Sequence, residues 1–369
     1  MAGDQRGMTM TKQGLRIAVI GAGVVGAAIA WHLARRGASV HLFDEGPRPA
    51  SGVTSRAFGW INFINGSPAT RPEDYRLRRD GVEEYRRLAT VLPDAVCDIR
   101  PGSLVWLETA EETEELIREH QAEGAGVELV DAVTIAKLEP HLRDVPPCAA
   151  YSPGDLALSP AALTDAFVKD AQAAGATAHF GETIIAIETS GSKVTGVRTT
   201  SGSQSADIVV LAAGVATGRL ASALGADIGV ESSPAVLLRY SASAPFINRI
   251  LCGPGLEVRQ WHDHSLFVAA AYRDDAEENS PAAVGQRALT KIRKRFAAPD
   301  DMHLVEAVVG QRPIFSDGLP RLGFLPDVEG AYVAVGHPGV ILAPLMGRLA
   351  AEEIVDGMRQ HSMLSPRQS

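Results

Sequence analysis

The first apolar positions of the chain fall into a strand, helix, strand pattern. Residues 15–20, LRIAVI, form an almost continuous apolar run, which is typical of a strand buried in the centre of a parallel sheet. Beyond a glycine-rich turn, the sequence AAIAWHLARRG predicts a helix that ends at Gly37. Residues 39–45 predict a second strand with Asp44 near its carboxyl end. We therefore predict a β-α-β unit over residues 15–45.

The turn between the first strand and the helix has the pattern G-x-G-x-x-G. Its glycines allow a tight turn, a close approach of the backbone to a pyrophosphate, and close packing of helix on strand, while the helix N-terminus favours phosphate. Asp44 follows the last glycine by 18 residues, near the spacing of about 20 for an acid that binds ribose hydroxyls. A glycine-rich packing helix would leave Asp44 unexplained. We therefore predict dinucleotide contacts at Gly21, Gly23, Val24, Val25, Gly26, Asp44 and Glu45.

Three later segments add further predicted elements. Residues 50–62 form a polar, glycine-punctuated loop. In residues 158–225, Ser159 is a predicted N-cap with Pro160 at the first helical position, and a helix, two strands of a Gly-Ser hairpin and the buried strand DIVVLAAG follow. Residues 317–357 predict a turn, the strand AYVAVG and a helix that opens near Pro344.

Together with the glycine turn, these segments resemble the D-amino-acid oxidase family of FAD-dependent oxidoreductases, which includes glycine oxidase and sarcosine oxidase. The later motifs follow one another in the order that the family has: the "AAG" strand, then GLPRLG, GHPGV and AP. The resemblance covers most of the chain. The resemblance implies an α/β (α+β overall) fold, with a Rossmann-type FAD-binding domain and a second, mainly antiparallel β substrate domain. The expected division is a disordered leader at 1–14, an FAD-binding domain of 15–66, 149–228 and 310–369, and a substrate domain of 67–148 and 229–309.

The resemblance also implies further contacts with FAD. Arg56 stands where some members carry a histidine bonded to the flavin, and Gly310 lies near the position of a flavin-linked cysteine in sarcosine oxidases. Non-covalent FAD is therefore expected. The residues implied to contact it, beyond those of the glycine turn, are Ser55, Arg56, Ile184, Ala213, Gly214, Gly339, Val340 and Ile341.

For the substrate, the segment GQRPIFSDGLP carries the most informative residue, Arg312. In glycine oxidase-like relatives the matching arginine binds the substrate carboxylate, for which a guanidinium fork is well suited. The alternative is a structural arginine paired with a carboxylate. His337 is either a second catalytic residue or a turn residue. The resemblance further places these side chains around the substrate pocket: Trp60, Asn62, Tyr240, Arg259, Trp261, His262 and Tyr272.

The expected reaction is oxidation of the C–N bond of an amino acid or N-substituted amino acid by hydride transfer to flavin N5, giving an imine that hydrolyses. Two alternatives stay open: a 2-hydroxy-acid dehydrogenase with His262 or His337 as base, and a flavin-holding subunit of a larger complex. The electron acceptor is oxygen or another carrier. No lysine lies between Lys193 and Lys291, so the lysine that promotes oxygen reaction in sarcosine oxidases has no counterpart, which favours a dehydrogenase.

Composition narrows the remaining classes. The 369 residues are 46% hydrophobic and 21% charged, as in ordinary globular proteins. A formal charge of −9 argues against binding to nucleic acid. The three cysteines, Cys97, Cys148 and Cys252, form no C-x-x-C pair, so we expect neither a metal site nor a redox disulfide, and a cytoplasmic location. No apolar run is long and clean enough to predict a membrane span.

Overall fold

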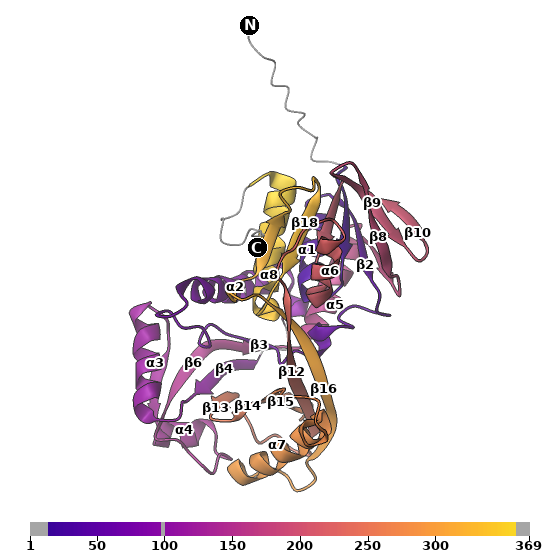
Figure 1. Ribbon diagram of the computed structural model, residues 1–369. Coiled ribbons are helices and arrows are strands. Elements are labelled where there is room, and N and C mark those ends of the chain that lie inside the picture. The colour runs from indigo at the N-terminus through magenta and orange to yellow at the C-terminus, as the bar shows by residue number, and fades with distance from the viewer. Residues whose placement is uncertain (1–13, 97–99, 359–369) are drawn as a thin grey trace.

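The computed structural model describes residues 14–96 and 100–358. The predicted leader, apart from Gly14, lies outside these residues, as does Cys97. Two large sheets form separate lobes, and strands β12 and β16 reach from one lobe toward the other (Figure 1). This arrangement confirms the predicted fold class.

The lobe of the six-stranded sheet contains the predicted β-α-β unit, with β1 pairing in parallel with β2 through α1. Its six strands run in the order β17-β18-β11-β1-β2-β7, all parallel except for β17. They span β1 Arg16–Ile20, β2 Ser39–Asp44, β7 Thr177–Phe180, β11 Ile208–Leu211, β17 Arg321–Phe324 and β18 Ala331–Val335.

Alternate residues of β1 enter different cores, because successive side chains of a strand point to opposite faces. Ile17 and Val19 pack with the helices, whereas Ala18 and Ile20 pack with a three-stranded sheet and α6. The helices of this lobe are α1 Val24–Arg35, α5 Pro160–Ala173, α6 Thr217–Ser222 and α8 Gly339–Asp356. The small sheet consists of β8 Ile184–Ser190, β9 Lys193–Thr199 and β10 Gly202–Ser205.

The other lobe is built on a nine-stranded sheet in which β4 and β13 are the one parallel pair among the described pairings. Strands β3 and β6, which the sequence assigned to the FAD-binding domain, pair within it. The strands are β3 Trp60–Ile61, β4 Arg100–Val105, β5 Glu128–Asp131, β6 Cys148–Ala157, β12 Glu231–Ser241, β13 Ile250–Gly253, β14 Leu256–Gln260, β15 Leu266–Ala271 and β16 His303–Ile314.

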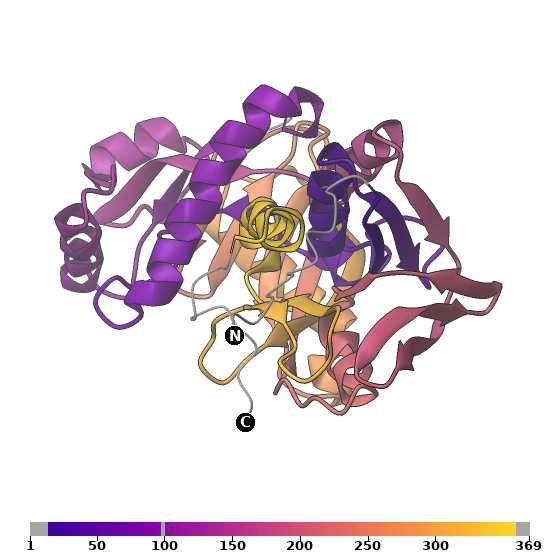
Figure 2. The same cartoon turned by 90° about the horizontal axis from the view of Figure 1, so that it is seen from above.

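Helices α3 Ala110–Ala122, α4 Ala132–Leu138 and α7 Pro281–Arg295 belong to the lobe of the nine-stranded sheet. Helix α2 Pro72–Val91 contacts α3 through Tyr75 and His120. However, α8 lies between α1 and α2 (Figure 2), and Leu77, Val82 and Leu88 of α2 share the core of the six-stranded sheet's lobe. The expected division therefore assigns α2 to the substrate domain, whereas its apolar side chains are buried against the other lobe. Short 3₁₀ turns complete the chain at Val53–Arg56, Pro93–Ala95, Gly214–Ala216 and Glu277–Asn279.

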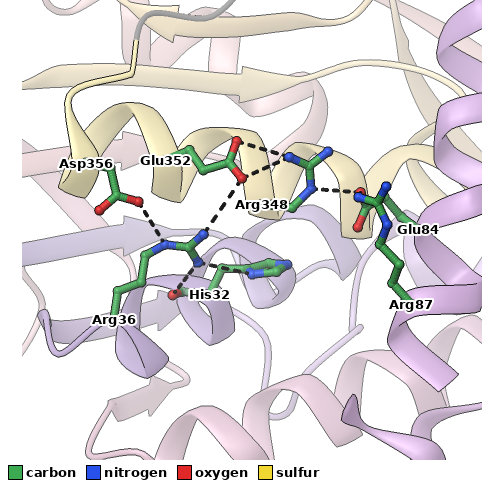
Figure 3. A network of polar contacts seen from close by, with 7 residues as sticks. All are labelled: His32, Arg36, Glu84, Arg87, Arg348, Glu352 and Asp356. Carbon is green, nitrogen blue, oxygen red and sulfur yellow. Dashed lines mark hydrogen bonds and ion pairs between the residues drawn. The ribbon is translucent and has the colours of Figure 1, made fainter. Parts of the chain in front are cut away.

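Helices α1, α2 and α8 are joined by a polar network (Figure 3). Arg348 of α8 donates from Nε to Glu84 of α2 at 2.7 Å and from Nη1 to Glu352 at 2.9 Å. Arg36, directly after α1, donates from Nε to Asp356 at 3.4 Å and lies 4.0 Å from Glu352. The network fixes α8, whose N-terminus lies at the site described below.

Helix α8 begins at Gly339, five residues earlier than predicted, so Pro344 lies inside it. A proline cannot donate to the carbonyl four residues before it, which normally disfavours such a position. Here the hydroxyl of the buried Tyr85, on α2, donates to the Val340 carbonyl at 2.6 Å. The Tyr85 hydroxyl thus replaces the hydrogen bond that Pro344 cannot donate. The sequence alone did not reveal this contact between distant segments.

Candidate functional site

The glycine turn after β1 is closed so tightly that two of its glycines leave no room for a side chain. Gly21 has φ +104°, and a Cβ there would lie 2.5 Å from the Ala212 carbonyl oxygen. A Cβ on Gly26 would lie 1.9 Å from the carbonyl oxygen of Gly21. The turn therefore has the geometry that the sequence predicted for a dinucleotide cradle.

Asp44, at the carboxyl end of β2, is held in place by the backbone. Its Oδ2 accepts from the Ala22 N–H at 2.6 Å, and its Oδ1 accepts from Gly46 at 2.8 Å. The side chain of Thr54, which the sequence analysis did not single out, accepts from the Val24 N–H at 3.1 Å. A threonine in a polar loop carries no sequence signal for this contact.

A first cavity, of about 250 Å³, opens where β1, β2 and β11 end; we call it the cradle cavity. Arg219, which was not predicted, adds a positive charge to its wall. The predicted residues that line it are Gly21, Gly23, Asp44, Glu45, Ile184, Ala213 and Gly214.

A second cavity, of about 350 Å³, lies between the two large sheets and is called the central cavity. Gly23, Thr54 and Gly214 line both cavities, so the two spaces adjoin. The predicted residues brought together here are Val24, Val25, Arg56, Trp60, Asn62, Arg312, His337, Gly339, Val340 and Ile341.

The first turn of α8 forms one wall of the central cavity. The N–H groups of Gly339, Val340 and Ile341 have no acceptor within the helix, because helix N-termini leave their first donors unpaired. They also lie at the positive end of the helix dipole. These features fit the two halves of a flavin dinucleotide. They are a glycine cradle, an acid at the end of β2 and two adjoining cavities with free helix donors.

Arg312 projects from β16 into the central cavity and is oriented by one neighbour. Its Nε donates to the Ser233 carbonyl at 3.1 Å and its Nη2 to the Ser233 hydroxyl at 2.8 Å. Among the described residues, no carboxylate forms an ion pair with this guanidinium. The alternative of an arginine paired with a structural carboxylate therefore finds no partner in the described chain.

His337 lines the same cavity, directly before α8. Burial, followed by the positive charges of Arg312 and Arg78, lowers the pKa of His337 to about 4, against a smaller opposing effect of Asp74. The imidazole is consequently neutral at physiological pH.

Seven predicted residues line neither cavity. Gly26 is one of them, and it packs against the Gly21 carbonyl beneath the cradle. The Ser55 hydroxyl is exposed and donates to the Gly52 carbonyl. His262 is exposed, and Tyr272 donates to Asp275 outside the cavities. The remaining three lie in or beside the core of the nine-stranded sheet's lobe: Tyr240, Arg259 and Trp261.

A register shift and local contacts explain two of these differences. The pairing of β12 with β16 shifts register between Arg239 and Tyr240, and Tyr240 is buried in the core with its hydroxyl donating to the Gly285 carbonyl. Arg259 donates from Nε to the Phe58 carbonyl at 2.6 Å, and its guanidinium lies 4.5 Å from the ring of Phe267. Each side chain is thus taken up by structural contacts.

Several cavity residues were missed by sequence reasoning. Arg78 lies on α2, where its Nε donates to Asp74 at 2.9 Å, and a lone arginine among many helix charges gives no signal. Glu257 lies on β14 between residues of the core, and the alternation of LEVRQ could have placed it on the opposite face. Others include Asn65, Ala235, Val236, Leu237 and Ala269.

Comparison with known proteins decides the family. Residues 16–353 match the family model described as "DAO: FAD dependent oxidoreductase". The chain belongs to this family. It is an FAD-dependent oxidoreductase, as its cradle and cavities indicated.

Relatives of this DAO-family chain include glycine oxidases. That of Bacillus licheniformis is 27% identical over 344 residues, covering 91% of this chain and 92% of the relative. That of Geobacillus kaustophilus is 28% identical, with the same coverage of each chain. The crystal structure of glycine oxidase from G. kaustophilus superposes with a TM-score of 0.82 at 25% identity, over 97% of this chain and 99% of the other.

Among the described residues there is neither a membrane-spanning helix nor a metal-binding cluster. In residues 14–96 and 100–358, no helix is both long enough and apolar enough to cross a membrane. Within the same ranges, no group of three or more His, Cys, Asp or Glu side chains is arranged to hold a metal ion.

Proposed function

We propose that this DAO-family protein oxidises the C–N bond of an amino acid or N-substituted amino acid. The observation that carries the proposal is Arg312, a guanidinium without an ion-pair partner among the described residues, which faces the cavity next to the dinucleotide cradle. Such a group binds a carboxylate through parallel N–H bonds. The glycine oxidases among the relatives support an amino-acid substrate.

Each part of the site has a separate task in this proposal. The N–H groups at the start of α1 bind the pyrophosphate and Asp44 the ribose hydroxyls of FAD. Bound FAD supplies the acceptor for a hydride from the substrate carbon. The first N–H groups of α8 stabilise negative charge at their end of the cavity, and Arg312 fixes the carboxylate. Orientation then provides most of the rate acceleration.

FAD binding is non-covalent in this proposal. Among the described residues that line the two cavities there is no cysteine, and the one histidine is His337. Arg56 donates from Nη1 to the Val309 carbonyl at 2.9 Å, which holds it at the wall of the central cavity as an anion partner. A cytoplasmic location, and electron transfer to oxygen or to another carrier, remain predictions from sequence.

A 2-hydroxy-acid dehydrogenase is the second candidate, and one observation favours it. His337 is neutral and lines the central cavity, so it could accept a hydroxyl proton. His262, the other base considered, is exposed and lines neither cavity. A flavin-holding subunit of a complex is the third candidate.

An anaerobic screen separates these functions. The FAD-reconstituted protein is mixed with glycine, N-methylglycine, further amino acids and glycolate, and the visible flavin absorbance is followed. Loss of absorbance with amino compounds supports the proposal. Loss with glycolate alone would establish the hydroxy-acid function instead, and no loss with any compound until a partner subunit is added would favour the third candidate.

A further inference from the structure

The walls of the central cavity carry several positive side chains and a single negative one. Arg56, Arg78 and Arg312 line it, and Glu257 is its one acidic residue among those described. Arg78 is paired with Asp74 and Arg312 is held by Ser233. Glu257, in contrast, accepts no hydrogen bond and forms no ion pair with any described residue. A largely buried carboxylate without a donor is costly unless a ligand supplies one.

Strand pairing fixes where this carboxylate lies. Leu256 and Val258, on either side of Glu257, belong to the core, so Glu257 faces the other side of the sheet. On that side the sheet exposes the small residues Ala235, Ala269 and Gly310 to the cavity, which leaves space for a ligand.

Glu257 and Arg312 lie apart on the cavity-facing side of the same sheet. Their strands, β14 and β16, are separated by β15 and β12, about 14 Å across the sheet at the usual strand spacing. Along the strands they are offset as well, because Val258 is in register, through Val268 and Leu238, with Ala307 of β16. The side chains form no ion pair, yet Arg312 lowers the pKa of Glu257 against a larger opposing effect of burial, with a result of about 7. The cavity therefore has a positive and a negative end.

We infer that Glu257 binds the substrate nitrogen and accepts its proton, while Arg312 binds the carboxylate. This inference rests on the proposed function and deepens it. The ammonium N–H bond breaks, an O–H bond forms on Glu257, and the electron pair stays on nitrogen, which gives the neutral amine needed for hydride loss. Zwitterionic amino acids are thereby selected over simple carboxylates and dicarboxylates.

Other titratable groups near Glu257 are few. Cys252 is its direct neighbour on β13, and burial, with a smaller effect of Glu257, raises the pKa of that thiol to about 12. On β14 itself, Arg259 lies two residues from Glu257 on the same face, where its Nε donates to the Phe58 carbonyl. Strand β15 contributes the apolar Ala269 to the cavity, whose other charged side chains are Arg56, Arg78 and Arg312, beside the neutral His337. Near pH 7, Glu257 is thus the group whose charge changes.

The test is Glu257→Gln, which keeps the shape and removes the charge, with Glu128→Gln on exposed β5 as the matched control. Ligand binding is measured by perturbation of the flavin spectrum and turnover by steady-state kinetics. Glycine should bind about 10- to 100-fold more weakly to Glu257→Gln, and acetate about three- to tenfold more tightly. The variant's kcat/KM should approach the wild-type value as the pH is raised toward the pKa of the substrate amine, about 10 for an alkylamine. At that pH the free amine is present in solution and needs no base.

Equal affinity of wild type and Glu257→Gln for glycine at pH 7.5 would overturn the inference. If the variant does not fold, the wild-type protein still decides: its affinity for acetate should rise as the pH falls through about 7, and a flat profile would contradict the role of Glu257. Failure of the proposed function is seen separately, as a wild-type flavin that no amino compound reduces.

Discussion

The cradle cavity and the substrate side of the central cavity are built from different parts of the chain. Around the cradle the backbone is the binding element of the proposed function: the turn at Gly21 and the N–H groups at the start of α1. On the substrate side, Arg312 and Glu257 project from a sheet whose other contributions to the cavity are mostly apolar. We therefore expect the fold to fix the cofactor and a few replaceable side chains to select the substrate.

The largest expected effect is in the cradle. Gly26→Ala would place a Cβ 1.9 Å from the Gly21 carbonyl oxygen, so helix and strand must separate at a cost of about 3 kcal/mol or more. We expect loss of bound FAD, measured by absorbance, and a lower melting temperature. Gly126→Ala, where a Cβ has open space, is the control. Wild-type FAD affinity in Gly26→Ala would show that close packing is not required there.

The same contrast explains how far the sequence could predict the structure. The glycine turn and Asp44 were predictable because the backbone of a dinucleotide-binding turn requires glycines and an acid at nearly fixed spacing along the sequence. The start of α8 was not, because Pro344 is accommodated by a hydroxyl from Tyr85, far away along the chain. Tyr240 and Arg259 were predicted to line the pocket, but a register shift in β12 and a hydrogen bond from Arg259 to the distant Phe58 carbonyl place them elsewhere. Glu257 was missed, although the alternation of LEVRQ carried a signal for it.

On the substrate side, Arg312→Ala should raise KM for carboxylate substrates about 10- to 100-fold, the usual value of a charged hydrogen-bonded contact. Flavin content should not change, because no cradle contact is lost. Arg239→Ala, which removes an exposed partner of Glu306 on the same sheet, is the matched control. Equal loss of flavin and of substrate affinity would make Arg312 a structural residue.

A smaller effect is expected where the two regions meet. Tyr85→Phe leaves the Val340 carbonyl without its donor, which should lower the free energy of unfolding by about 1–2 kcal/mol. Denaturant titration measures this change. Tyr151→Phe removes a hydroxyl that has no hydrogen-bond partner among the described residues, and should have less effect. Equal stability of the two variants would contradict the role given to Tyr85.

The smallest effect is expected for a residue that only the sequence placed in the pocket. His262→Ala should leave KM and kcat within about twofold of wild type, since exposed positions away from such sites contribute little. Steady-state kinetics with the best amino-acid substrate provides the measurement. A large rise in KM would mean that His262 reaches the substrate after all.

The central claim, that the cradle binds FAD independently of the side chains that select substrate, is tested most directly by one dissociation constant. FAD is titrated into the apoprotein of wild type and of the double variant Arg312→Ala, Glu257→Gln. We expect equal affinity for FAD, with reduction by amino acids lost in the double variant. A marked loss of FAD affinity in the double variant would contradict it.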